Sequence, residues 1–204
     1  MRTGFIVGGV LLLVCSIGVA QQTTKKDGKP AKKVTAAQPA EANMPKPSPE
    51  VEKAIKQLTG KYKVTGKILD ESWVKGGDEG SGTETGRKGP GGFSVISDAQ
   101  MKFKKMGPMT GHGLLWWDDS KKAFQSLWCD SWGPTCQPGG EGKWDGDKLV
   151  FQGEMMMGPV PMQVRQAYSN FSANGFDWTM DAGDGKGNWK PQMALKYEKE
   201  AAKK

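Results

Sequence analysis

The residue types that could do chemistry gather in one stretch, residues 111–136. This stretch holds the only histidine, His112, together with two of the three cysteines and four of the eight tryptophans. Acid–base or nucleophilic catalysis needs a base that a second group orients. No G-x-S-x-G, H-E-x-x-H or P-loop pattern supplies that arrangement, and Asp118 and Asp119 are typical turn formers. The sequence therefore predicts that the protein is not an enzyme.

Cys129 and Cys136 enclose six residues that include Gly133-Pro134. Two cysteines at this spacing in an exported protein predict a local disulfide, with two unpaired thiols as the alternative. No C-x-x-C or Cys/His set accompanies them. A zinc site is therefore not expected.

The methionines are the second group of chemical interest. Thioethers suit Cu(I), so Met155 and Met157, together with His112, are candidate metal ligands. Methionine also fills irregular apolar space, and consecutive strand residues point to opposite faces, so residues 155–157 cannot all converge on one ion. Packing or the lining of a ligand pocket is favoured over copper. We therefore predict no cofactor, with haem or Cu(I) as the alternative.

The elements that must position these residues begin with one helix. Ser48 can cap it, Pro49 suits its first position, and residues 51–58 carry a single apolar stripe before Gly60. A short amphipathic helix ahead of many strands could lie across the open end of a barrel or sandwich.

Alternating apolar and polar residues then predict a series of short strands. Residues 112–117 and 123–132 form one hairpin, and Asp145-Gly146 marks the turn of another. We expect a first long strand from residue 62 to residue 73. The segment 75–92 predicts a loose loop with a polar strand through Thr83 and Thr85. Residues 93–96 and 101–105 then read as the next strands.

Short links between about nine or ten strands predict an all-β fold, an antiparallel up-and-down barrel of lipocalin-like form preceded by one short α-helix. Closure is favoured over an open sheet because it removes exposed edges. Large aromatic and methionine side chains on one face of successive strands would line the interior. The residues expected there are Trp116, Trp117, Trp128, Phe151, Met162, Trp178 and Met180.

Residues 1–20 have the pattern of a signal peptide, with Arg2 followed by an apolar stretch and small residues before Gln21. The apolar stretch is shorter than the roughly 20 residues that a spanning helix needs. We therefore expect an exported protein, either periplasmic or secreted. A lipid anchor on Cys15 is less favoured because Val14 is larger than the residues that usually precede a lipidated cysteine.

Residues 21–47 are Lys-, Ala- and Pro-rich and predict a disordered linker, followed by a barrel domain at 48–198 and a charged tail at 199–204. The linker carries a net charge of +4 and Arg2 one further positive charge, out of +7 for the chain. Residues 48–204 therefore carry only +2. That balance argues against a nucleic-acid partner, which needs basic residues clustered on a folded face. Peripheral contact of the basic tail with the cell envelope is the expectation instead.

Several motifs also resemble a known group of proteins. They are Leu58-x-Gly60-x-Tyr62, Gly111-x-Gly113-x-Leu115-x-Trp117-Asp118, Lys122-x-Phe124 and Trp128-x-Asp130. In this order, after a helix, they resemble a bacterial family of unknown function, over roughly residues 45 to 198. The resemblance implies export and a lipocalin-like or nitrobindin-like barrel, and it implies no activity. Nitrobindin-like barrels place a haem-binding histidine near the C-terminal end, but residues 160–204 contain none.

The favoured function is non-catalytic binding of a small apolar ligand in the barrel interior, an inference from fold and lining. A packed structural or interaction module of the cell envelope is the alternative. A haem- or copper-binding barrel is the second alternative. The sequence does not indicate the ligand or the oligomeric state.

Overall fold

The structure is a computed structural model that describes residues 45–157 and 160–201. The described elements run from Pro49 to Lys199. The expected signal peptide, Cys15 and nearly all of the expected linker lie outside the described residues. None of the described helices is both long and apolar enough to cross a membrane.

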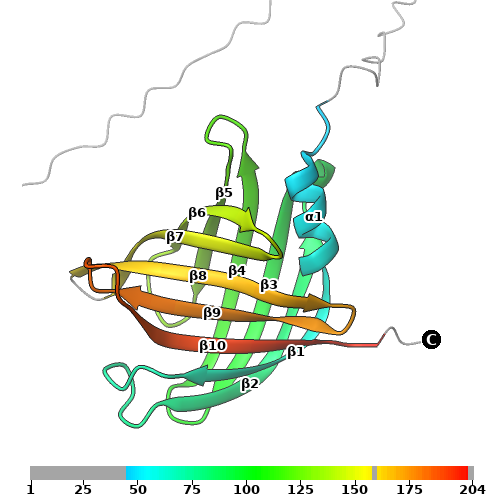
Figure 1. Cartoon of the computed structure of the whole chain (residues 1–204). Helices are drawn as coiled ribbons and strands as arrows, with labels where there is room; N and C mark the ends of the chain where they lie inside the picture. The colour runs from blue at the N-terminus through cyan, green and yellow to red at the C-terminus, as the bar shows by residue number, and fades with distance from the viewer. Residues whose placement is uncertain (1–44, 158–159, 202–204) are drawn as a thin grey trace, which may run out of the picture. The chain divides into compact units, whose positions relative to one another are not determined.

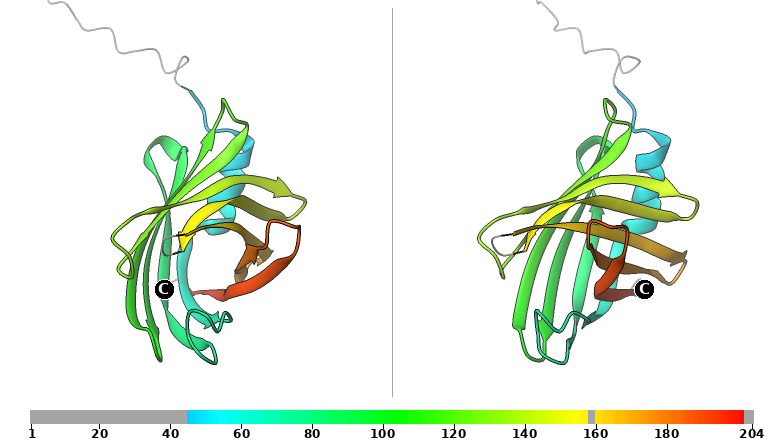
Figure 2. Two further views of the ribbon diagram at one scale, coloured as in Figure 1. Left: turned by 90° about the vertical axis from the view of Figure 1, so that its left-hand side faces the viewer. Right: turned by 60° about the vertical axis from the view of Figure 1, so that its left-hand side comes forward.

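Ten strands make up one closed antiparallel barrel (Figures 1 and 2). Each strand pairs with the next in the chain, and β10 pairs with β1 to close the sheet. The all-β, up-and-down prediction is confirmed. The elements are α1 (Pro49–Leu58), β1 (Gly60–Ile68), β2 (Asp78–Lys88), η2 (Pro90–Gly92), β3 (Ser94–Phe103), β4 (Gly107–Asp118), β5 (Ala123–Asp130), β6 (Gln137–Asp145), β7 (Lys148–Met157), β8 (Val160–Ser172), β9 (Gly175–Gly183) and β10 (Trp189–Lys199).

Three strands differ from the sequence expectation. Residues 94–96 and 101–103 belong to one continuous strand, β3, and the first strand ends at Ile68, well before Trp73. The segment expected to be mostly loop contains the regular strand β2, whose eleven residues include Thr83 and Thr85.

Helix α1 forms as predicted and packs against the barrel (Figure 1). The Ser48 hydroxyl accepts the Val51 N–H at 3.4 Å, which satisfies one free donor of the first turn. Val51, Ala54 and Leu58 enter the hydrophobic core. The Trp144 indole lies between the helix and the β6–β7 turn, with its Nε1 3.4 Å from the Glu50 carbonyl oxygen. The helix therefore closes one end of the barrel, called the helix end below.

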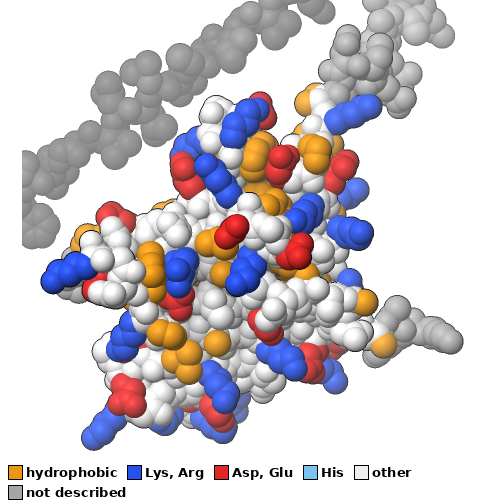
Figure 3. Space-filling view, viewed as in Figure 1, with side chains coloured by type: hydrophobic (Ala, Val, Ile, Leu, Met, Phe, Trp, Pro, Cys, Tyr) orange, Lys and Arg blue, Asp and Glu red, His pale blue; other side chains and the backbone are white. Residues whose placement is uncertain are grey.

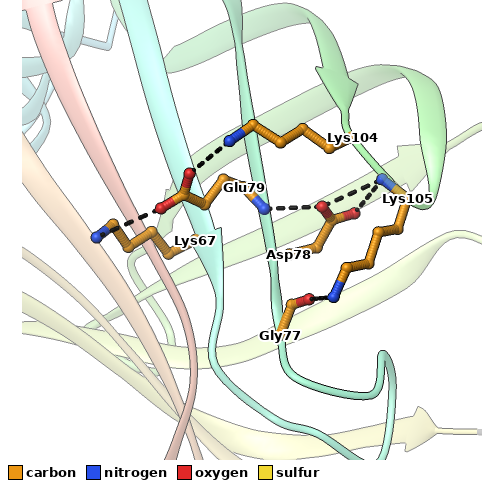
Figure 4. Close-up of polar contacts among 6 residues, drawn as sticks. All are labelled: Lys67, Gly77, Asp78, Glu79, Lys104 and Lys105. Carbon is orange, nitrogen blue, oxygen red and sulfur yellow. Dashed lines mark hydrogen bonds and ion pairs between the residues drawn. The ribbon is translucent and has the colours of Figure 1, made fainter.

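The opposite end is fastened by two buried carboxylates. Asp70 Oδ1 accepts the Ser72 N–H and the Lys190 ammonium, each at 2.9 Å. Burial alone would raise the pKa of Asp70, but these bonds outweigh it and lower the pKa to about 2. Asp78 accepts the backbone N–H groups of Glu79, Lys105 and Met106, as Figure 4 shows for the first two. Both carboxylates stabilise turns at this end.

The disulfide Cys129–Cys136 is present, as the spacing predicted. Cys129 lies in β5, and Cys136 immediately precedes β6. The bond therefore joins the two strands across the loop that contains Gly133 and Pro134.

Reduction of this bond should lower the free energy of unfolding by about 2–3 kcal/mol, because it frees a short loop in the unfolded chain. Urea denaturation with and without dithiothreitol measures the change. The C129S/C136S double variant should match the reduced protein and should not respond to dithiothreitol. Equal midpoints for the oxidised and reduced wild type would contradict this expectation.

Candidate functional site in the barrel interior

The helix end of the barrel is filled by aromatic side chains. Phe176 stacks on Tyr197 with ring centroids 4.3 Å apart, and Tyr62 meets the edges of both rings. Phe124 and Phe151 are almost completely buried beside them. The Tyr62 hydroxyl lies 3.1 Å from the Thr59 carbonyl oxygen, which ties this cluster to the end of α1. Packed rings therefore occupy this part of the interior.

The middle of the barrel differs, because side chains there face inward and still contact solvent. Cross-strand partners share a face of the sheet. Gln166 stands opposite the buried Phe151 and Met180 and is nevertheless only partly buried. Other inward residues share this partial exposure. We call the space that they enclose the interior hollow, and its lining comprises Glu84, Ser97, Trp128, Gln166, Tyr168 and Trp178.

Two glycines of β4 make room for the largest of these side chains. A Cβ atom on Gly111 would collide with the Trp128 ring, and one on Gly113 would lie 3.1 Å from it. The Trp128 Nε1–H donates to Asp130 Oδ2 at 2.8 Å, which fixes the ring over the glycines. The Gly-x-Gly spacing therefore positions an indole on the wall of the hollow.

Glu84 is the central polar group of the hollow. It pairs across the sheet with Tyr62 and Ala99, both buried, so its carboxyl points inward. Tyr197 Oη donates to Glu84 Oε2 at 3.0 Å. Burial raises the pKa of Glu84 to about 7, against the lowering effect of hydrogen bonds from Tyr197 and Ser97. Glu84 as a whole residue is partly buried, and burial is the largest influence on the pKa of its carboxyl.

The tyrosines around Glu84 remain protonated phenols. Burial raises the pKa of Tyr62 to about 12, and the nearby Glu84 charge acts in the same direction. Burial and the same charge raise the pKa of Tyr168 and of Tyr197. Three neutral O–H groups therefore lie near one carboxyl group.

No basic side chain balances Glu84 from within. The basic residues at inward register positions nearby, Lys88 opposite Val95 and Lys199 opposite Tyr62, are both exposed to solvent. Arg165 of β8 points outward, where its guanidinium pairs with Asp181 at 2.7 Å. The six residues that line the interior hollow therefore include one acid, Glu84, and no base.

Among the depressions on the surface of the described residues are a larger and a smaller one. The larger, about 650 Å³, lies outside strands β1, β2, β9 and β10 and is lined by Lys67, Glu79, Lys102, Lys104 and Lys196 among others. Glu79 pairs there with Lys104 at 2.7 Å and Lys67 at 3.7 Å (Figure 4). The smaller, about 350 Å³, lies between α1 and the β8–β9 turn. Figure 3 shows basic and acidic side chains interspersed over one face, so neither sign dominates that face.

Comparison with known proteins identifies the family. Residues 47–199 match the family described as "Protein of unknown function (DUF1579)". The chain belongs to this family. A search of the curated proteins found no match.

Among solved structures, the crystal structure of Rv2717c from M. tuberculosis is similar over 76% of this chain and 99% of that chain. Its TM-score is 0.53 at 12% sequence identity, a likeness that shows the fold alone. A redesigned β-barrel, mFAP0, bound to DFHBI, matches over 70% of this chain and 99% of that chain, with a TM-score of 0.39 at 14% identity. The resemblance to an unknown-function family with a barrel fold is thereby confirmed.

Six of the seven residues predicted to line the interior of this DUF1579 barrel lie on its inward face. Trp128 and Trp178 border the hollow, and Met162 stands opposite the inward Met155. The other three, Trp117, Phe151 and Met180, pack with the buried cluster. The prediction for Trp116 is wrong. It neighbours Trp117 on one strand, so the two must point to opposite faces, and Trp116 lies outside opposite Ser94 and Gln125.

The candidate metal ligands do not come together. His112 lies on the outer face of β4, where its Nδ1 is 2.6 Å from Asp98 Oδ1. Met155 points inward, with its sulfur 3.7 Å from Gln166 Nε2. The side chain of Met157 lies outside the described residues. Within the described part of the chain, no three His, Cys, Asp or Glu residues cluster as a metal site.

The sequence analysis missed Ser97, Gln166 and Tyr168 of the lining of the hollow and, above all, Glu84. A polar strand through Thr83 and Thr85 was expected, and strand alternation then places Glu84 on the opposite face. That face was not identified as the inward one, because the strand's other inward residues are mostly glycines. The sequence feature that could have identified Glu84 is an acidic residue that alternates with Gly80, Gly82 and Gly86 on one face of the strand.

Replacement of Glu84 by glutamine should make stability less dependent on pH. The folded-state pKa of about 7 exceeds the ordinary value of 4.5, so the protonated carboxyl favours folding and this contribution is lost as pH rises through 7. The E84Q variant keeps both hydrogen bonds without a charge. It should equal the wild type near pH 4.5 and exceed it at pH 8.5 by up to about 3 kcal/mol.

Urea denaturation of both proteins across this pH range is the measurement. The matched control is E79Q, which makes the same change on the outer face of the same strand and should give no gain at pH 8.5. A constant difference between E84Q and the wild type at all pH values would show that Glu84 titrates normally.

Proposed function

We propose that the protein binds a small, largely apolar ligand in the interior hollow and does not catalyse a reaction. The observation that carries this proposal is the contrast between the two levels of the barrel. Rings fill the helix end, whereas inward side chains in the middle remain accessible to solvent. A site that is mostly aromatic with a few placed polar groups is typical of small-molecule binding.

The lining fits such a ligand in shape and chemistry. Trp128 and Trp178 offer flat apolar surfaces, and Met155 and Met162 offer side chains that adapt to irregular shapes. Glu84 and Gln166 supply the polar contacts that would fix the orientation of the ligand. A fully packed envelope module would have no use for a buried carboxyl that costs stability at neutral pH.

We also propose that the protein is exported and that its basic linker contacts the cell envelope. This proposal rests on the signal-peptide pattern of residues 1–20 and the +4 charge of residues 21–47. The disulfide Cys129–Cys136 is compatible with an oxidising compartment. Intact-mass measurement of protein recovered from the producing cell's periplasm or medium tests it, with a mature chain beginning at Gln21 as the expected result.

Filling the hollow should abolish binding. Isothermal titration calorimetry with 2-(2-naphthyl)ethanol, an uncharged bicyclic probe, should give saturable binding to the wild type. The Q166W variant places an indole at an inward position and should weaken affinity at least about 10-fold, or about 1.4 kcal/mol. The control Q163W adds the same ring to the exposed face of the same strand and should bind like the wild type.

Circular dichroism and thermal melting establish that both variants are folded. Native mass spectrometry of protein purified from its own host adds a test independent of any variant. A wild type that neither takes up the probe nor carries a co-purifying small molecule would refute the proposed function.

A further inference from the structure

We infer that the interior hollow selects apolar molecules that carry a protonated amine, whose ammonium group pairs with the Glu84 carboxylate. This inference rests on the proposed function, because it names the class of ligand that the same hollow would hold. It states which charge of the ligand's polar group the site prefers.

The first support is the charge of the lining. Two other carboxylates, Asp78 and Asp130, lie at inward positions, but both already accept hydrogen bonds from N–H groups. Asp78 accepts three backbone N–H groups, and Asp130 accepts the Trp128 indole N–H and the Trp132 backbone N–H. Glu84 is therefore the carboxyl with acceptor positions left for a ligand. The basic residues at nearby inward register positions, Lys88 and Lys199, are both exposed to solvent. An ammonium ion would complete an ion pair, whereas a carboxylate ligand would face a like charge.

The second support is the arrangement around the carboxyl. Tyr197 donates to one oxygen, Oε2, at 3.0 Å, and Ser97 supplies a second hydrogen bond to the carboxyl. An ionised carboxylate accepts about four hydrogen bonds, so positions remain for the N–H groups of an ammonium ion. Tyr62 stands opposite Glu84 across the strand pair, and Tyr168 is near enough to sense its charge. Aromatic faces attract organic cations, so these rings complement the same headgroup.

The third support is the effect on the site itself. A buried carboxylate without a partner is costly, and Glu84 escapes that cost in the free protein by holding a proton near neutral pH. An ammonium ion provides the missing partner and stabilises the ionised form. Binding of an amine should therefore release the proton, which a neutral or anionic ligand would not do.

Three ligands with one apolar body test the preference. They are 2-(2-naphthyl)ethylamine, 2-(2-naphthyl)ethanol and 2-naphthylacetate, titrated calorimetrically into the oxidised protein at pH 8. The amine should bind at least about 10-fold more tightly than the alcohol, as for a charge-assisted hydrogen bond, and the acetate should bind most weakly.

The E84Q variant should lose the preference for the amine while it keeps its affinity for the alcohol. The control E79Q removes a carboxylate from the outer face of β2 and should keep the wild-type order. At pH 6.5, titrations in phosphate and in imidazole buffers, which differ in ionisation enthalpy, should reveal a proton released by the amine with the wild type. No such proton should appear with E84Q or with the alcohol.

The outcomes separate the two proposals. Binding of all three ligands with similar affinity, or an amine preference that survives in E84Q, would overturn the ammonium inference and leave the binding function standing. Failure of every ligand to bind the wild type, together with an empty native mass spectrum, would overturn the binding function. Tighter binding of the acetate would show that the carboxyl acts as a neutral hydrogen-bond donor instead.

Discussion

The pairing of β1 with β10 is the constraint on which the remainder of the structure depends. Seven residue pairs, from Tyr62–Lys199 to Ile68–Met193, join the first strand to the last. Because β2 binds the other edge of β1, the sheet has no free edge and one of its faces becomes an interior. Closure also places Tyr197 within 3.0 Å of Glu84, a residue 113 positions earlier in the chain. The polar centre of the hollow exists only in the closed barrel.

The parts of the fold that could be predicted are those with local causes. Ser48 and Pro49 specify the start of α1, and the alternation from Phe124 to Asp130 specifies which face of β5 points inward. Non-local causes explain the failures. The inward face of β2 is largely glycine, and Phe103 fills the space at Gly80, where a Cβ would lie 2.7 Å from its ring. Because the apolar side chains that cover β2 come from the neighbouring strand, the sequence of β2 itself lacks the apolar alternation that predicts a strand.

The candidate site was predicted unevenly for the same reason. Aromatic and methionine positions follow from period-two patterns, although the adjacent Trp116 and Trp117 could not both face inward. Glu84 violates the rule that inward residues are apolar, and nothing local marks it as inward. Such violations are expected at functional sites, where the site costs stability that other parts of the molecule must supply. Here the packed aromatic cluster and α1 provide that stability at the helix end, while several inward side chains in the middle of the barrel are only partly buried.

His112 lies on the outer face of the barrel and is linked to Glu84 through the charge of Asp98. Its hydrogen bond is the largest cause that lowers the pKa of Asp98, and Arg87 adds to it from 3.5 Å. Asp98 follows Ser97 on β3, so its carboxylate lies on the outer face behind the residue that bonds Glu84. The Asp98 charge is, after burial, a further cause of the raised pKa of Glu84. Arg87 and His112 pair with that charge on the outer face. The rare histidine therefore lies outside the hollow and bears on Glu84 only through the charge of Asp98 across a single layer of sheet.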